Sequence, residues 1–167
     1  MATPFYGTVA AFRAYFTERG KDVSALLDGN ISASLVVASE WLDATFRGQF
    51  PGLKVGMRAQ VREWPRNGAT DVYGYVIDMT VPPIEVEQAT YQAAYNDATV
   101  QGVMSAPFQP SQYKSVSVSG AVAVDFASFF DASEAQKQFP IISEILTPVL
   151  IGSLAGSARY SGSTVRA

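Results

Sequence analysis

The sequence predicts a mainly α-helical single domain, a helical bundle with a small β element, and three observations carry that prediction. Apolar residues recur at helical spacing in four stretches, at about 8–19, 32–50, 84–100 and 140–150. A valine-rich run at about 113–126 alternates and is interrupted by Ser119-Gly120, which predicts a β-hairpin. The length of 167 residues favours one domain, which we place at residues 1–150.

The first two helices are indicated by apolar stripes and by their stop signals. In the first, Val9, Phe12 and Phe16 share a face, and Gly20 follows as a stop. We expect a break at Gly29-Asn30, after which Ser32 caps the second helix. Its stripe recurs at spacings of four, three, four and four through Ile31, Leu35, Ala38, Leu42 and Phe46.

The segment 52–83 contains Pro65, Pro82 and Pro83, so no long helix can cross it. Irregular segments of this length are uncommon in compact domains and tend to be functional or to form interfaces. Residues 71–79 alternate weakly and are a candidate short strand.

The third helix begins at Pro82-Pro83, because proline fits the first helical turn, where its missing N–H would lack a partner. Glu85 and Glu87 then lie where the helix dipole favours negative charge. A flat face of small residues, which permits close helix contact, follows at Ala89, Ala93 and Ala94.

The hairpin at 113–126 has two candidate registers. A three-residue loop, 119–121, would pair Val118 with Val122 and Val116 with Val124. A two-residue loop would instead place alanines opposite the valines. We prefer the three-residue loop, although glycine at its middle position is not the usual choice.

The last helix, 140–150, is apolar nearly all round and must be buried on more than one side. Pro148 removes one helical hydrogen bond and should kink or end it. The tail, 151–167, is rich in glycine, serine and alanine, so we expect it to be flexible alone and ordered on docking to a partner.

Composition excludes most familiar chemistry. The chain has no histidine and no cysteine, which removes the Ser-His-Asp triad, thiolate nucleophiles and most transition-metal sites. Nothing fixes the separation of the candidate acid–base carboxylates, Asp71, Asp78, Glu85 and Glu87. No phosphate-binding or dinucleotide motif is present. We therefore expect no enzyme, no cofactor and no metal.

We also expect no association with a membrane. The longest apolar stretch, 140–154, is interrupted by Glu144 and Pro148 and is shorter than the roughly 20 residues that span a bilayer. The first residues lack the basic start and apolar run of a signal peptide, so we expect a soluble, intracellular product. Only 16% of residues are charged, which favours a surface that is partly buried against other subunits.

Positive charge is concentrated in one segment. Residues 47–66 carry five basic groups against Glu63 alone, whereas residues 67–144 carry two against nine acids. Within the segment, Arg58, Arg62 and Arg66 recur every four residues. Three interpretations stay open for them: a solvated or salt-bridged loop, a surface facing DNA, and ion pairs between subunits.

The most distinctive tetrapeptide is Glu63-Trp64-Pro65-Arg66. The residue before a proline is extended, so Trp64 should project from a stiff turn. Its ring could pack in the core, anchor a contact with another subunit, or stack on a nucleic-acid base.

These segments together resemble a known family. The order is a helix ending in Trp41-Leu42-Asp43, the Glu63-Trp64-Pro65-Arg66 turn, a helix opened by Val81-Pro82-Pro83-Ile84, a valine-rich hairpin and a final Phe139-Pro140-Ile141-Ile142 helix. The pattern resembles tailed-bacteriophage proteins often labelled "DnaT-like single-stranded DNA-binding", and in organisation it is similar to head-tail adaptor (connector) proteins. The resemblance covers roughly residues 5–150; Val55 to Arg62 and the tail depart from it.

The resemblance implies a head-tail adaptor-like structural protein of the virion, made in the host cytoplasm. Its copies would form a ring, dodecameric in that family, between the portal protein and a tail-side neck protein (stopper, tail terminator or tail tube). Genome DNA would pass through the ring without sequence readout. The alternative function is a single-stranded DNA-binding, primosome-like replication protein, but the net charge of −3 favours the adaptor.

Two sets of site residues follow. Candidate DNA-channel residues are Arg58, Arg62 and Arg66. Candidate subunit or partner contacts are Trp64, Arg66, Val116, Val118, Val122, Val124, Leu154 and Tyr160.

Overall fold

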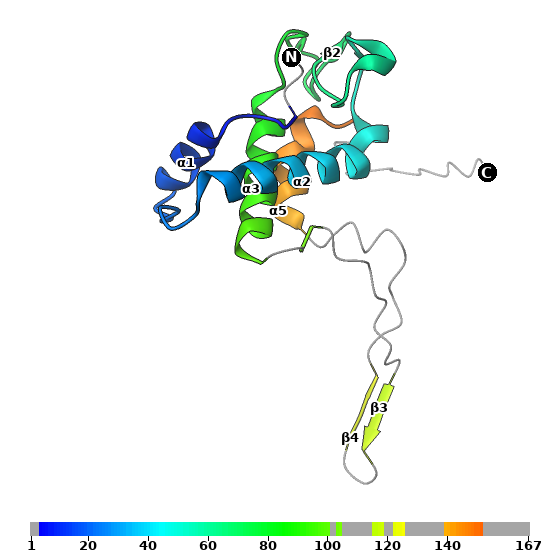
Figure 1. Ribbon diagram of the computed structural model, residues 1–167. Helices are drawn as coiled ribbons and strands as arrows, with labels where there is room; N and C mark the ends of the chain where they lie inside the picture. Colours follow the sequence, from blue (N-terminus) through cyan, green and yellow to red (C-terminus); the bar gives the residue numbers. More distant parts are fainter. Residues whose placement is uncertain (1–3, 101–102, 105–114, 119–121, 126–138, 152–167) are drawn as a thin grey trace, which may run out of the picture.

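The computed structural model describes residues 4–100, 103–104, 115–118, 122–125 and 139–151, and it is mainly helical with a small antiparallel hairpin, as predicted. Its helices are α1 (Val9–Thr17), α2 (Asp28–Phe46), α3 (Ile84–Thr99) and α5 (Pro140–Leu146) (Figure 1). The 3-10 turns are η1 (Arg47–Gln49), η2 (Met57–Ala59) and η4 (Thr147–Val149). The strands are β1 (Leu53–Lys54), β2 (Arg66–Asn67), β3 (Ser115–Val118) and β4 (Val122–Asp125).

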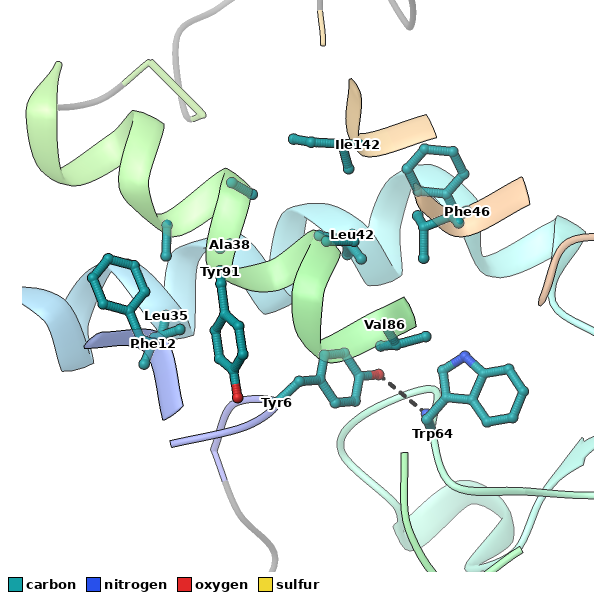
Figure 2. Close-up of a cluster of buried hydrophobic side chains, with 14 of the residues drawn as sticks. Tyr6, Phe12, Leu35, Ala38, Leu42, Phe46, Trp64, Val86, Tyr91 and Ile142 are labelled. Atoms are coloured by element: carbon teal, nitrogen blue, oxygen red, sulfur yellow. Dashed lines mark hydrogen bonds between the residues drawn. The ribbon is translucent and has the colours of Figure 1, made fainter. Parts of the chain in front are cut away.

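The core forms where α2 crosses α3 and where α5 packs on α3 (Figure 1). The predicted face of small residues lies at these crossings, and Ala89, Ala93 and Ala94 are each 0% exposed. Small side chains let the helix backbones approach closely, and larger side chains such as Leu42 and Ile142 also lie in this core (Figure 2).

α1 covers one side of this core with aromatic rings. Thr8 caps the helix by accepting a hydrogen bond from the Ala11 N–H at 3.0 Å. The Phe12 and Phe16 rings meet edge to face, with centroids 4.9 Å apart, and Phe16 contacts Tyr95 of α3 at 4.6 Å. Aromatic contacts therefore join the first and third helices, and the apolar face predicted for the first helix is the one that is buried.

The start of α2 differs from the prediction. The helix begins at Asp28, so Gly29-Asn30 lies in its first turn and is not a break, and Ser32 is not the cap. Arg13 of α1 explains the earlier start, since it binds the Asp28 carboxylate at 2.6 Å and the carbonyl oxygens of Val23 and Leu26. Asp28 is also favoured by the helix dipole. At its other end α2 stops at Phe46, and η1 replaces the last predicted turn.

The hairpin has the preferred register. β3 and β4 pair with Val118 opposite Val122 and Val116 opposite Val124, which leaves the three-residue connection 119–121. The other residues of the predicted range 113–126 lie outside the described residues. The side chains of these four valines lie outside the described residues.

The C-terminal part also follows the prediction closely. α5 begins with Pro140 and changes to η4 at Thr147, as expected from Pro148. The tail from residue 152, with Leu154 and Tyr160, lies outside the described residues.

The candidate strand at 71–79 is wrong: the structure has only an isolated bridge there, between Thr70 and Val76. In the described part of the chain, no helix combines the length and apolarity needed to cross a membrane.

Candidate interaction surface

The segment after α2 is organised by a two-stranded frame at one end of the molecule (Figure 1). β1 and β2 pair Leu53 with Asn67 and Lys54 with Arg66, so the residues between the two strands form a loop that is closed at its base. Gly52 enters this frame at a φ of +70°, and a Cβ atom there would lie 2.4 Å from the Asn67 carbonyl oxygen. Glycine is needed at this position for both reasons.

Trp64 lies in the core. It is 2% exposed, and its ring meets Phe50 edge to face at 5.6 Å. Its backbone N–H donates a hydrogen bond to the Tyr6 hydroxyl at 3.1 Å (Figure 2). Of the three interpretations of Trp64, only core packing matches this burial, because an interface anchor or a base-stacking platform needs an exposed ring.

Glu63 is the centre of a buried ion-pair cluster. Its carboxylate lies 2.8 Å from Arg66 Nη1, 3.2 Å from Arg47 Nε and 3.5 Å from Lys54 Nζ. These three cations come from β2, η1 and β1 respectively. Arg66 also donates to the carbonyl oxygens of Pro51 and Gly52, each at 2.7 Å. One buried carboxylate therefore joins both strands to the end of α2.

Arg62 forms a second buried cluster with the N-terminal segment. It donates to the Pro4 carbonyl oxygen at 2.8 Å and lies 3.4 Å from both Asp43 Oδ2 and Glu40 Oε1 of α2. The Tyr6 hydroxyl donates to Asp43 Oδ1 at 2.5 Å. Burial raises the pKa of Asp43 and, with the nearby carboxylate, also that of Tyr6.

The three arginines predicted to share a role are thus separated by the fold. The side chains of Arg62 and Arg66 are each 9% exposed and bind carboxylates, which matches the salt-bridged loop. The prediction that they line a DNA channel does not fit this burial, and neither does Arg66 as an exposed partner contact. Arg58 is exposed on η2 and can still meet DNA or another subunit.

The apolar side chains of this end face outward. Of the fourteen large apolar residues that lie exposed in the described part of the chain, ten fall between Leu53 and Ile84. The first group lies around β1 and η2: Leu53, Val55, Met57 and Val61. The second lies between β2 and α3: Tyr73, Tyr75, Val76, Met79, Val81 and Ile84.

Two residues of the first group, Leu53 and Met57, line a pocket of about 420 Å³. Its walls combine apolar and cationic side chains, namely Leu53, Lys54, Met57, Arg58 and Arg66. Met57 and Leu53 are 80% and 76% exposed, so a partner could cover much apolar surface here. We call this the basic pocket.

The second group is presented by a tight turn, residues 71–76, which we call the tyrosine turn. Asp71 accepts hydrogen bonds from the N–H groups of Tyr73 at 2.9 Å and Tyr75 at 2.8 Å. Gly74 adopts a φ of +87°, and the Val72 N–H donates to the Pro148 carbonyl oxygen of η4 at 2.9 Å. The turn is therefore tied to the body while Tyr73 and Tyr75 remain 71% and 73% exposed.

Sequence reasoning did not single out these two tyrosines. The signal was present as Asp71-Val72-Tyr73-Gly74, since aspartate at the first position and a glycine soon after are typical of turns. Of the four candidate acid–base carboxylates, Asp71 accepts hydrogen bonds within the tyrosine turn, Asp78 accepts hydrogen bonds from Thr80, and burial raises the pKa of Glu87. Within the residues described, no group of acidic side chains is placed to hold a metal ion.

Comparison with known proteins gives a match to a protein family. No curated protein and no solved structure matches the chain. A family model described as "Putative DnaT-like ssDNA binding protein" matches residues 5–167. Because this match spans nearly the whole sequence, the chain belongs to the DnaT-like family.

Proposed function

We propose that this protein is a structural subunit of a tailed-phage virion, which forms the head-tail adaptor ring between the portal and a tail-side neck protein. The observation that carries the proposal is the exposed apolar surface of residues 53–84. Met57 and Val76, for example, are 80% and 83% exposed. Exposed large apolar side chains that gather in one segment of the chain favour contacts with other proteins.

The way this surface is supported favours a permanent contact. The Glu63 cluster fixes β1 and β2, and the Asp71 side chain fixes the tyrosine turn. Outward apolar groups on a fixed backbone lose little conformational freedom when a partner binds. A ring of identical subunits is a natural use of such a surface, because every copy then covers the same apolar groups.

The charges support a limited role towards DNA. Four of the five basic residues between 47 and 66 bind carboxylates: Arg47, Lys54, Arg62 and Arg66. Arg58 has no ion pair within the described residues. A single such cation in segment 47–66 of each copy suits a ring through which DNA passes without sequence readout.

The test is made on purified phage particles that carry the gene for this chain. Mass spectrometry should find the protein in the particles, and electron microscopy should place a ring of its density at the neck. Light scattering of the protein alone should give a monomer or weak oligomer that assembles when portal rings are added. Absence from the particles, together with a stable monomer in the presence of portal, would contradict the proposal.

A second candidate function, binding of single-stranded DNA, is favoured by the description of the family and by exposed Tyr73 and Tyr75, since bases can stack on such rings. Fluorescence anisotropy with an oligothymidine probe tests it. Binding at about 50 mM salt that falls steeply by about 200 mM would support this candidate. No binding at the lower salt concentration would remove it and leave the adaptor.

A further inference from the structure

We propose that the tyrosine turn of one copy occupies the basic pocket of the next copy. The inference rests on the proposed ring and specifies its subunit contact. The turn supplies two exposed tyrosines on an acidic segment, and the pocket supplies apolar walls with an exposed arginine. Tyr73 and Tyr75 of the turn and Leu53 and Met57 of the pocket are all exposed in the single chain.

The pocket has the chemistry to hold an aromatic ring. Its volume of about 420 Å³ lies between the Leu53 and Met57 side chains and the cations Lys54, Arg58 and Arg66. The Met57 thioether and the Arg58 guanidinium both pack favourably on aromatic faces. Lys54 and Arg66 are held by Glu63, so the floor of the pocket is fixed before the ring arrives.

Charge complementarity identifies the turn as the occupant. Between residues 67 and 87 the sequence contains four acidic residues, Asp71, Asp78, Glu85 and Glu87, and no lysine or arginine. The Asp78 side chain is exposed close to the turn, where it can meet a cation of another copy. Tyrosine and arginine are also the residues that contribute most to protein interfaces.

The proposed contact needs two copies, because within one chain the tyrosine turn does not cover the basic pocket. Tyr75 is 73% exposed and Leu53 is 76% exposed in the same structure. A contact between two different surfaces can be repeated from copy to copy, and it closes into a ring when the rotation allows. The absence of positive charge from segment 67–87 weighs against single-stranded DNA stacked on Tyr73 and Tyr75, and it favours a basic protein surface as the occupant of the turn.

Cysteine cross-linking tests the contact directly, because the natural chain has no cysteine. A Met57→Cys, Tyr73→Cys double variant is assembled on portal rings and then oxidised. We expect a ladder of disulfide-linked dimers, trimers and larger species in a denaturing gel without reductant. Each single variant should give no ladder, and neither should a matched pair of exposed positions, Met57→Cys with Glu18→Cys at the C-terminal end of α1.

Charge exchange tests the same contact without cross-linking. Arg58→Glu alone and Asp78→Arg alone should each weaken self-association roughly tenfold, measured by sedimentation. The double variant should recover most of the loss, since the pair is re-formed with reversed signs. Circular dichroism checks that each variant is folded. A further variant, Tyr75→Ala, leaves the Asp71 hydrogen bonds in place and should weaken association without any change of charge.

The outcomes separate this inference from the proposed function. Rings that assemble without a ladder, or without recovery in the double variant, would overturn the contact and leave the adaptor intact. A disulfide that forms inside one chain, with no increase in mass, would also overturn it. Absence of rings from particles would instead contradict the proposed function itself.

Discussion

The helical body and the segment 52–83 are stabilised in opposite ways. In the body, apolar side chains point inward, and Phe12, Leu42 and Ile142 are 0% exposed. In the segment, carboxylates and guanidinium groups point inward, whereas Leu53, Met57 and Tyr75 face solvent. The difference teaches that burial of charge around Glu63 and Asp43 leaves the apolar residues of this region available for a partner.

Trp64 is the place where the two regions meet, and its truncation should have the largest effect. Trp64→Ala removes a ring that is 2% exposed and packs on Phe50, so we expect a loss of about 3–5 kcal/mol in the free energy of unfolding. Urea unfolding followed by circular dichroism measures it. Tyr73→Ala, on the exposed turn, is the control and should change stability by less than about 0.5 kcal/mol. Equal effects for the two variants would remove the distinction between the regions.

Truncation of Glu63 should destabilise the protein nearly as much, because its buried carboxylate binds cations from both strands of the segment. Glu63→Ala leaves Arg66 buried without its carboxylate, and we expect a loss of about 3 kcal/mol. Glu40→Ala is a matched control, since the Glu40 side chain is 64% exposed although it also binds an arginine. It should cost at most about 1 kcal/mol. A loss for Glu63→Ala as small as that for Glu40→Ala would show that the cluster is not what fixes the segment.

Tyr6→Phe should have an intermediate effect on the free energy of unfolding, and it tests the link between the two regions. The variant keeps the ring but removes the hydroxyl that donates to Asp43 and accepts from the Trp64 N–H. Two buried groups lose a partner, so we expect a loss of about 1–3 kcal/mol in the same unfolding experiment. Tyr15→Phe serves as the control. If the two phenylalanine variants are equally stable, the Tyr6 hydroxyl does not connect the regions.

The smallest effect is a dependence on pH. Burial raises the pKa of Asp43 in the folded chain above its usual value of 3.8, so the folded chain binds this proton more tightly than the unfolded chain. This contribution to stability is present below the unfolded pKa and is lost as the pH rises through the folded pKa. Asp43→Asn should therefore weaken the decline of stability with rising pH. Urea unfolding at several pH values between about 3.5 and 7 measures how the free energy of unfolding changes with pH in the natural protein and in Asp43→Asn. Parallel curves for the two proteins would contradict the raised pKa of Asp43.

The body could be predicted from the sequence because its signals are local. Helical spacing and prolines located the four helices, and of the two hairpin registers that the valine pattern allowed, the preferred one is observed. The start of α2 was missed because Arg13, fifteen residues earlier, holds Asp28 in place. A contact across a turn is not visible in the periodicity of either helix.

The segment 52–83 could be recognised as irregular but not interpreted. The four-residue spacing of Arg58, Arg62 and Arg66 suggested a common face, yet no helix spans these residues, and the chain path sends two of them inward. Their carboxylates come from α2 and from Glu63, and only the folded chain brings them together. For Trp64, local sequence allowed three environments, and long-range packing selected one.

The link between the N-terminal segment and residues 62–64 also bears on the order in which this protein matures. The hydrogen bonds from Arg62 to Pro4 and from Trp64 to Tyr6 each span 58 positions. Contacts between residues so distant along the chain form later than the turns of a helix. We therefore expect a newly synthesised copy to complete the exposed apolar surface of residues 53–84 last. This order would delay association between copies that have not finished folding.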